Sequence, residues 1–435
     1  MPIVFGVWTN RNNQIVLLTN RIHMNHQHIL FLLIAITVFD FLSSKVLGIL
    51  NQRNSKKPIP NELDGVYDKD RYKQAQAYQS EILIFSSVSS TIHFIGMLAI
   101  LWLGLFGWLE NLVADRFTVP MQATLIFFGV LYFISDVTSI PFQWYGTFVI
   151  EEKYGFNKTS IKTFILDKLK GWLLTCVIGG ALLSIFLILI DAFGPIFWIY
   201  FWIVAAAFMI IMNMFYSSLI MPLFNKLTPL YDGPLKDAIV AYSQKVSFPL
   251  SNIFVIDGSK RSSKANAFFS GMGKKKKVVL YDTLIDNHST EELVGVFAHE
   301  VGHYKKKHII QSMVIGILQM GLMLWILGSV IWSEPVALAL GGNAPSIPLG
   351  ILAFGILFSP VSTLLGVLMN MLSRKNEYEA DEYAVRTYQA EPLISALKKL
   401  TSDNLGNLTP HPWVVFVNYS HPTLLQRIRA MKSIK

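Results

Sequence analysis

A short stretch past the middle of the chain carries residues that together can bind a metal ion. Residues 297–308 read FAHEVGHYKKKH, in which His299 and His303 lie four positions apart and Glu300 follows the first histidine. Residues four apart on a helix project from the same face, so both imidazoles can reach one zinc ion. Glu300 is then placed to take a proton from a water molecule beside the ion. The pattern predicts metal-assisted hydrolysis, and the alternative is a surface helix with two ordinary histidines.

The residues before this stretch predict where its helix begins. Ser289 and Glu292 match a capping box, in which each side chain bonds the other's backbone N–H. A helix is therefore expected to begin near Thr290 and to carry both histidines.

A second segment offers a third ligand. A catalytic zinc ion usually takes three protein ligands and keeps one position open. The segment SRKNEYEADEYAVRTYQA holds Glu377 and Asp381, four apart on an expected helix. Glu377 is the candidate third ligand, and Asp381 can accept the second N–H of a ligating histidine. Solvated surface acids are the alternative. The only cysteine, Cys176, lies in an apolar stretch, so a thiolate metal cluster is excluded.

A third segment, NYSHPTLLQRIRAM, contains His421 and Arg427 close to the end of the chain. An imidazole or guanidinium near the ion could stabilise the negative oxygen that develops during peptide hydrolysis. Five other polar residues have no supporting pattern and are expected to be structural: His288, His308, Glu379, Glu382 and His411.

Long apolar segments predict a polytopic membrane protein that positions these groups. Of the 435 residues, 52% are hydrophobic and only 15% charged, whereas soluble domains carry about 25% charged residues. A membrane-spanning helix needs about 20 mostly apolar residues. Seven segments meet this requirement: 28–48, 82–108, 121–148, 171–192, 195–222, 309–333 and 347–372. A mainly α-helical fold with about seven transmembrane helices is therefore expected.

Two of these segments carry polar groups. Segment 82–108 holds Ser86, Thr91 and His93, and it is expected to line a polar interior. Segment 121–148 holds Asp136, and an acid at membrane depth normally faces a cavity or a partner. A structural ion pair and the lining of a cavity remain equal alternatives for Asp136.

Basic residues divide the loops into two groups. Four segments are rich in lysine and arginine: 49–81, 149–170, 223–308 and the tail after 373. Two segments are poor in them: 109–120 and 334–346. Since cytoplasmic loops collect positive charge, we expect the basic segments and the C-terminus in the cytoplasm and the N-terminus outside. This distribution accounts for the net charge of +9, and without a binding motif nucleic acid is not an expected partner.

The chain is expected to divide as follows. Residues 1–27 form a poorly ordered extension, and a mis-assigned start codon before Met24 would remove residues 1–23 from the mature protein. Residues 28–222 hold the first five spans, with cytoplasmic loops 49–81 and 149–170. A zinc-binding domain at 223–308 combines a helix at 234–247 with a small antiparallel sheet built from strands at 252–257 and 277–284. Spans six and seven follow at 309–372, and a helical part of the same domain occupies 373–435.

The three site segments, in this order and spacing, resemble the motifs of the type I CAAX prenyl protease family. Its members are multi-span zinc metallopeptidases of the endoplasmic reticulum and of bacterial membranes. The segments PIPNELDGVYDKDRYKQAQAYQ and SSKANAFFSGMGKKKKVVLYDTL are similar to the same family. The resemblance therefore extends over the chain from about Met24.

The resemblance implies seven helices around a water-filled chamber, with the zinc domain on the cytoplasmic side. It implies one zinc ion per chain on His299, His303 and Glu377, and Glu300 as general base. By the same resemblance His421 faces the tetrahedral intermediate, Asp381 and Arg427 support the ligands, and the substrate pairs with an edge strand at Asn266, Ala267 and Phe268. From the residues alone KANAFF is a plausible edge strand, and a hairpin without a substrate role is equally consistent.

The resemblance also implies the substrate, the C-terminal tripeptide of prenylated CAAX proteins. The alternative is a bacterial quality-control protease that cuts unprenylated membrane or stalled peptides. The expected partners are a peptide or protein substrate and membrane lipids, and a monomer is expected. A bacterial inner membrane is favoured, or the endoplasmic reticulum membrane if the source is eukaryotic.

Three other classes compete with this interpretation. An intramembrane site-2-type protease would bury its zinc helix in lipid, where Glu291, Glu292 and Lys305 would be costly. A heat-shock-type membrane protease would have fewer spans. A transporter or scaffold with a closed structural zinc site would need a fourth protein ligand, and no cysteine is nearby.

Overall fold

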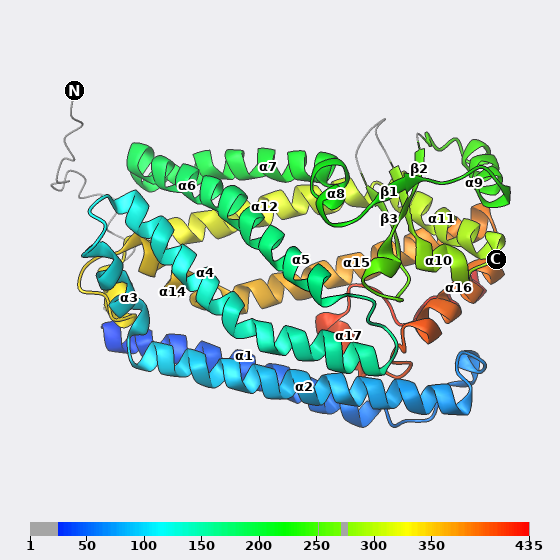
Figure 1. The fold of residues 1–435 in the computed structure, drawn as a ribbon, viewed down its shortest axis with the longest axis horizontal. Helices are drawn as coiled ribbons and strands as arrows, with labels where there is room; N and C mark the ends of the chain where they lie inside the picture. Colours follow the sequence, from blue (N-terminus) through cyan, green and yellow to red (C-terminus); the bar gives the residue numbers. More distant parts are fainter. Residues whose placement is uncertain (1–24, 251, 271–276, 435) are drawn as a thin grey trace.

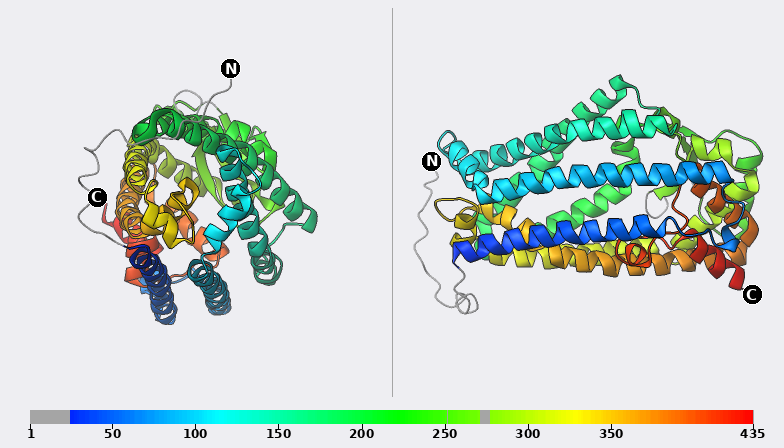
Figure 2. Two further views of the ribbon diagram at one scale, coloured as in Figure 1. Left: turned by 90° about the vertical axis from the view of Figure 1, so that its left-hand side faces the viewer. Right: turned by 90° about the horizontal axis from the view of Figure 1, so that it is seen from below.

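The computed structural model describes residues 25–250, 252–270 and 277–434. The expectations for residues 1–23 lie outside this part of the chain. Figure 1 shows an elongated molecule, with long helices running along its length and a small sheet with shorter helices gathered at one end. The two further views in Figure 2 show the same arrangement, with the C-terminal helices at the end that carries the sheet.

Long helices form most of the length of the molecule. They are α1 (His26–Asn54), α2 (Lys69–Trp102), α4 (Pro120–Tyr145), α5 (Ile161–Leu174), α6 (Gly180–Phe193), α7 (Phe197–Leu219), α12 (His308–Val330), α14 (Ile347–Leu357) and α15 (Ser359–Thr387). Two π-helical turns extend this set, η3 (Gly146–Glu151) after α4 and η4 (Thr175–Gly179) between α5 and α6.

Many large apolar side chains on these helices are exposed, which suits helices that lie in lipid. Phe39, Ile95, Trp102 and Leu364 are among them. Among the described residues, five helical stretches are long and apolar enough to cross a membrane, or six if the bent pair α14 and α15 forms one span. One stretch, Ile161–Phe224, contains two of the predicted segments, joined where the chain turns at Gly194 (φ 53°). The count of seven stays a prediction.

The two polar segments line cavities between the helices. Ser86 and His93 on α2 line a cavity of about 690 Å³. Asp136 on α4 lies 2.7 Å from Lys168 Nζ and accepts a hydrogen bond from Trp172 Nε1 on the wall of a cavity of about 300 Å³. Asp136 therefore combines the two alternatives, because it is paired and it also lines a cavity. A single continuous chamber remains what the family resemblance implies.

The sheet differs from the prediction. Its strands are β1 (Leu227–Pro229), β2 (Asn252–Ile256), β3 (Ala267–Ser270) and β4 (Lys277–Tyr281), in the order β1-β2-β4-β3. The predicted strands β2 and β4 pair parallel, whereas β1 with β2 and β3 with β4 pair antiparallel, so the sheet is mixed and not antiparallel throughout. Val278, Val279 and Leu280 make β4 almost fully buried, which favours the centre of the sheet. The strand β3 therefore takes the edge and forms the antiparallel pair with β4.

The main core beside this sheet includes buried residues of α2, α10 (Asp282–Asn287) and α15 and of four further helices. These four are α9 (Pro234–Lys245), α11 (Thr290–Lys305), α16 (Ala390–Asp403) and α18 (Leu424–Ser433). The helix α11 begins at Thr290 with the predicted capping box. Its residues Val294, Phe297, Ala298 and Val301 are buried in that core. Because α11 is packed on several sides, the side chains that it directs toward α15 are held firmly.

Short elements connect the rest. They are η2 (Asn61–Leu63), α3 (Leu105–Ala114), η5 (Gly194–Ile196), α8 (Met221–Phe224), η6 (Gly258–Lys260), α10 (Asp282–Asn287), α13 (Glu334–Ala339) and α17 (Pro412–Asn418).

Candidate active site

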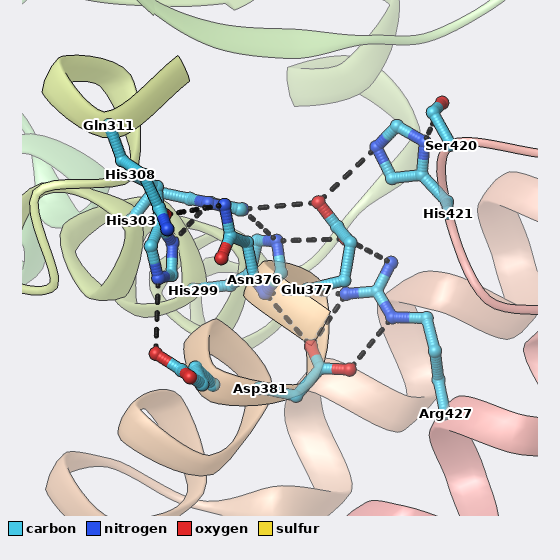
Figure 3. Close-up of polar contacts among 11 residues, drawn as sticks. His299, His303, His308, Gln311, Asn376, Glu377, Asp381, Ser420, His421 and Arg427 are labelled. Carbon is cyan, nitrogen blue, oxygen red and sulfur yellow. Dashed lines mark hydrogen bonds and ion pairs between the residues drawn. The ribbon is translucent and has the colours of Figure 1, made fainter. Parts of the chain in front are cut away.

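The helix α11 presents His299 and His303 toward Glu377 on α15, as Figure 3 shows. The Nε2 atoms of the two histidines lie 3.1 Å apart. Glu377 Oε1 is 3.2 Å from His303 Nε2, and Glu377 Oε2 is 3.5 Å from His299 Nε2. Glu377 lies 74 positions after His303 and 78 after His299 in the chain, and the fold brings its carboxylate against both imidazoles.

The arrangement can hold one metal ion. One possible ligand atom from each of His299, His303 and Glu377 lies within 4.8 Å of the other two. Ligands at about 2.0–2.1 Å from a tetrahedral zinc ion are separated by about 3.3–3.4 Å, and a small shift of the Glu377 carboxylate, whose two oxygens lie 3.2 and 3.5 Å from the two Nε2 atoms, would bring one oxygen to that separation. Glu377 Oε2 is buried and accepts no hydrogen bond among the described residues, although Arg427 Nη1 and His299 Nε2 each lie 3.5 Å from it. A buried carboxylate oxygen left in this state is costly, and a cation between these three residues would satisfy it.

The close approach of the two helices depends on Gly302. A Cβ atom at this position would lie 2.9 Å from both Cα and O of Ala380 and 3.1 Å from Cβ of Tyr383. Gly302 on α11 and Ala380 on α15 therefore bring the two backbones close enough for Glu377 to reach the histidines.

Asp381 and Arg427 contact the candidate ligand His299. Asp381 Oδ1 is 2.8 Å from His299 Nδ1, so it can accept the N–H of that ring. Arg427 donates from Nε and Nη2 to the same carboxylate at 2.8 and 2.6 Å. Burial works against the charge of Arg427, but Asp381 outweighs it and raises the pKa of the guanidinium. The pair keeps Asp381 ionised and holds the imidazole in one orientation.

Glu300 lies on α11 directly after the first histidine. Burial raises the pKa of its carboxyl group, against the effect of the nearby histidines. Within the part of the chain that the structure describes, this carboxylate has no hydrogen bond or ion pair at contact distance. Its oxygens are therefore available to a water molecule or a substrate.

His421 reaches the cluster from the loop after α17. Its Nε2 atom lies 3.4 Å from Glu377 Oε1, and its Nδ1 atom is 3.0 Å from Ser420 Oγ. The side chain is 63% exposed, so a substrate could contact it. Figure 3 shows His421 and His303 on opposite sides of Glu377.

Two residues that hold this loop were not found by sequence reasoning. Arg374 Nη1 donates to the backbone oxygen of Tyr419 at 2.5 Å, and Asn370 Nδ2 donates to that of Val417 at 2.7 Å. Both donors lie on α15 before Glu377. No local pattern indicated them, because each bond joins positions more than 40 residues apart.

His308 also differs from its expectation as an ordinary residue. Its Nδ1 atom is 3.0 Å from His303 Nδ1, and its Nε2 atom is 3.3 Å from Glu379 Oε2. Glu379 had been expected to play a structural part on another face of its helix. The other residues without a pattern, His288, Glu382 and His411, bond outside the cluster, to Leu284, Arg386 and Trp413.

The three residues proposed for substrate binding lie at the edge of the sheet. Asn266 comes directly before β3, and Ala267 and Phe268 are its first two residues. Among the described strands, β3 pairs with β4 alone, so its other side is not paired with a strand. Before the strand, Lys264 pairs with Glu151 at 2.8 Å and donates to Tyr78 Oη at 2.7 Å.

The fold and the cluster together define a multi-span membrane metallopeptidase. Residues 49–226 match the family model described as CAAX prenyl protease N-terminal, five membrane helices. Residues 229–435 match the model of Peptidase family M48. The chain therefore belongs to the CAAX prenyl protease 1 family of membrane zinc metalloproteases, as its relatives also show.

The chain is 34% identical to the CAAX prenyl protease 1 homolog of Oryza sativa subsp. japonica, over 91% of this chain and 95% of that protein. It is 32% identical to CAAX prenyl protease 1 of Saccharomyces cerevisiae, over 87% and 90%. The crystal structure of S. mikatae Ste24p superposes with a TM-score of 0.86 at 31% identity, over 93% of this chain and 98% of that one. These relatives do not favour the transporter or scaffold alternative.

Proposed function

We propose that this chain hydrolyses peptide bonds with one zinc ion held by His299, His303 and Glu377, and that it removes the C-terminal tripeptide of prenylated CAAX proteins. The observation that carries the proposal is the cluster of His299, His303 and Glu377, in which one possible ligand atom from each residue lies within 4.8 Å of the others, beside the carboxylate of Glu300. The substrate class follows from the names of the relatives, which are CAAX prenyl proteases.

The side chains divide the chemical work. Bound zinc would polarise the scissile carbonyl and lower the pKa of a water molecule to about 7. Glu300 would take the proton of that water and later give it to the leaving amine. Burial raises the pKa of this carboxyl group, which makes the carboxylate a stronger base than an exposed glutamate. His421 would donate from Nε2 to the oxygen on which negative charge develops.

Substrate binding is proposed at the edge strand. An extended peptide can add to the unpaired side of β3 through backbone hydrogen bonds. Asn266, Ala267 and Phe268 would form this edge. The strand β3 contacts α11, the helix with both histidines, which supports placing the scissile bond near the cluster.

Location is proposed from charge. The basic segments and the zinc cluster would face the cytoplasm and the N-terminus would lie outside. A bacterial inner membrane is the proposed location, with the endoplasmic reticulum membrane as the alternative in a eukaryotic cell. We propose that the monomer is the functional unit.

A cleavage assay with two matched peptides tests this function. The purified protein is incubated with one CAAX peptide in farnesylated and in unprenylated form, and the release of the tripeptide is measured. We expect faster cleavage of the farnesylated peptide and a rate about 10²–10⁴-fold lower for Glu300→Gln. Equal cleavage of both peptides would favour the quality-control alternative. A wild-type rate for Glu300→Gln would refute the assignment of the general base.

A further inference from the structure

The second ring nitrogen of His303 meets another imidazole and not a carboxylate. Its Nδ1 atom lies 3.0 Å from Nδ1 of His308, and the opposite nitrogen of His308, Nε2, lies 3.3 Å from Oε2 of Glu379. We call His303, His308 and Glu379 the row; Figure 3 shows the first two on the side of Glu377 away from His421. The neighbouring ligand His299 is supported differently, because its Nδ1 atom meets Asp381 directly at 2.8 Å.

Only one arrangement of protons agrees with a metal on this cluster. A metal on Nε2 of His303 leaves the proton on Nδ1, which must then donate to Nδ1 of His308. His308 consequently carries its own proton on Nε2 and donates it to Glu379. With these protons, each N–H of His303 and His308 has an acceptor, and each nitrogen without a proton has a donor or the metal.

The backbone places His308 for this contact. The helix α11 ends at Lys305 and α12 begins at His308, with Lys307 between them in the left-handed region at φ 60°. A side chain other than glycine rarely adopts this conformation. His308 is only 4% exposed, and Glu379 lies two residues after the candidate ligand Glu377. The turn costs energy, and it brings the imidazole against His303.

We propose that His308 and Glu379 are positioning residues that fix the tautomer and ring orientation of His303 when metal is bound. This inference rests on the proposed function, because it requires His303 to be a ligand. Groups of this kind around a metal site commonly change metal affinity or activity by about 10–100-fold.

A cavity beside His303 and His308 determines how strongly we expect substitutions of His308 to weaken zinc binding. It has a volume of about 420 Å³ and is lined by His303, His308, Ser312, Ser373 and Asn376, among other residues. Water in this space could partly replace a truncated imidazole, so His308→Ala is expected near the lower end of that range. His308→Phe fills the volume and accepts no hydrogen bond, so it is expected near the upper end.

The test measures metal binding rather than turnover. Zinc dissociation constants are determined by chelator competition, and the visible absorption spectrum of the cobalt(II)-substituted protein reports ligand geometry. We expect zinc binding weaker by about 10-fold for His308→Ala and about 100-fold for His308→Phe, each with an altered cobalt spectrum. His308→Gln offers an amide oxygen to His303 and should restore most of the affinity.

His288→Gln is the matched control. His288 is also a buried histidine, and its Nδ1 atom bonds only the backbone oxygen of Leu284. This variant should leave zinc affinity and the cobalt spectrum unchanged.

Two outcomes would overturn the inference in distinguishable ways. Wild-type affinity and spectrum in His308→Ala and His308→Phe would refute the positioning role and leave the proposed function intact. A wild-type chain that binds no zinc would refute both. If the His308 variants do not fold, Glu379→Ala tests the same inference, because the Glu379 side chain is one-third exposed and its truncation should leave the fold intact. Unchanged zinc affinity in Glu379→Ala would overturn the proposed positioning role.

Discussion

At the scale of single residues, His303 links the chemistry to pH. Burial alone would lower the pKa of its imidazole, but the hydrogen bond with Glu377 and the charge of Glu300 raise it above its ordinary value. A protonated imidazole cannot bind a metal, so acid and zinc compete for this ring. Zinc therefore binds when the pH is above the raised pKa of His303, and it is released as the pH falls below that pKa.

We predict that the apparent zinc dissociation constant rises about tenfold for each pH unit below that pKa, since one proton is displaced. Chelator competition from pH 8 to pH 5 measures this dependence. Glu300→Gln removes one of the two charges that raise the pKa, so its zinc affinity should begin to fall at a lower pH. A dissociation constant independent of pH would contradict this account of His303.

Much of the residue-scale site could be predicted. The spacing of His299, His303 and Glu377 already indicated a metal site, because helical periodicity fixes which side chains share a face. The row through His308 could not be predicted, because it depends on the left-handed turn at Lys307. Nothing in three consecutive lysines indicates which of them adopts that conformation.

At the scale of elements, the site depends on how closely α11 and α15 pack. Gly302→Ala would place a Cβ atom 2.9 Å from the backbone of Ala380. The helices must separate or shift, and such overpacking typically costs about 1–3 kcal/mol. Because Glu377 lies one turn before Ala380, we expect lower thermal stability together with weaker zinc binding, measured on the same detergent-solubilised preparation.

Gly366→Ala on the same helix α15 is the control. A Cβ atom there would meet nothing within 4 Å, and alanine favours a helix over glycine by about 1 kcal/mol. This variant should be neutral or slightly more stable, with wild-type zinc affinity. If Gly302→Ala behaves like Gly366→Ala, close helix packing does not control the ligand geometry.

The positions of the helices and strands could largely be predicted from the sequence, but the way in which the strands pair could not. The helix at Thr290, the helix from Pro234 and the positions of β2 and β4 all agree with local patterns. The parallel pairing of β2 with β4 was missed. A strand pattern shows which residues face the core, but the order of strands depends on which of them is most buried, and that is a property of the whole domain.

At the scale of the whole molecule, a loop rich in basic residues and a loop poor in them lie at opposite ends of the elongated fold. The basic loop after α1 lies toward the end with the sheet, whereas residues 334–346 lie at the opposite end (Figure 1). The positive-inside rule then predicts that the zinc cluster faces the cytoplasm.

Cysteine labelling tests this orientation. With Cys176 replaced by serine, single cysteines are introduced at Lys56 and at Asn343, both exposed positions. In intact cells, or in sealed vesicles whose outer face corresponds to the outside, a membrane-impermeant maleimide should label Asn343→Cys at once. Lys56→Cys should react only after permeabilisation. The reverse pattern would contradict the proposed orientation.

The central claim is that one zinc ion lies between His299, His303 and Glu377. Anomalous X-ray diffraction at the zinc absorption edge, on crystals whose metal content is known from mass spectrometry, tests it most directly. The account predicts one zinc ion per chain, bonded to both Nε2 atoms and to the Glu377 carboxylate at about 2.0–2.2 Å. A zinc ion elsewhere in the chain, or an active preparation without zinc, would contradict it.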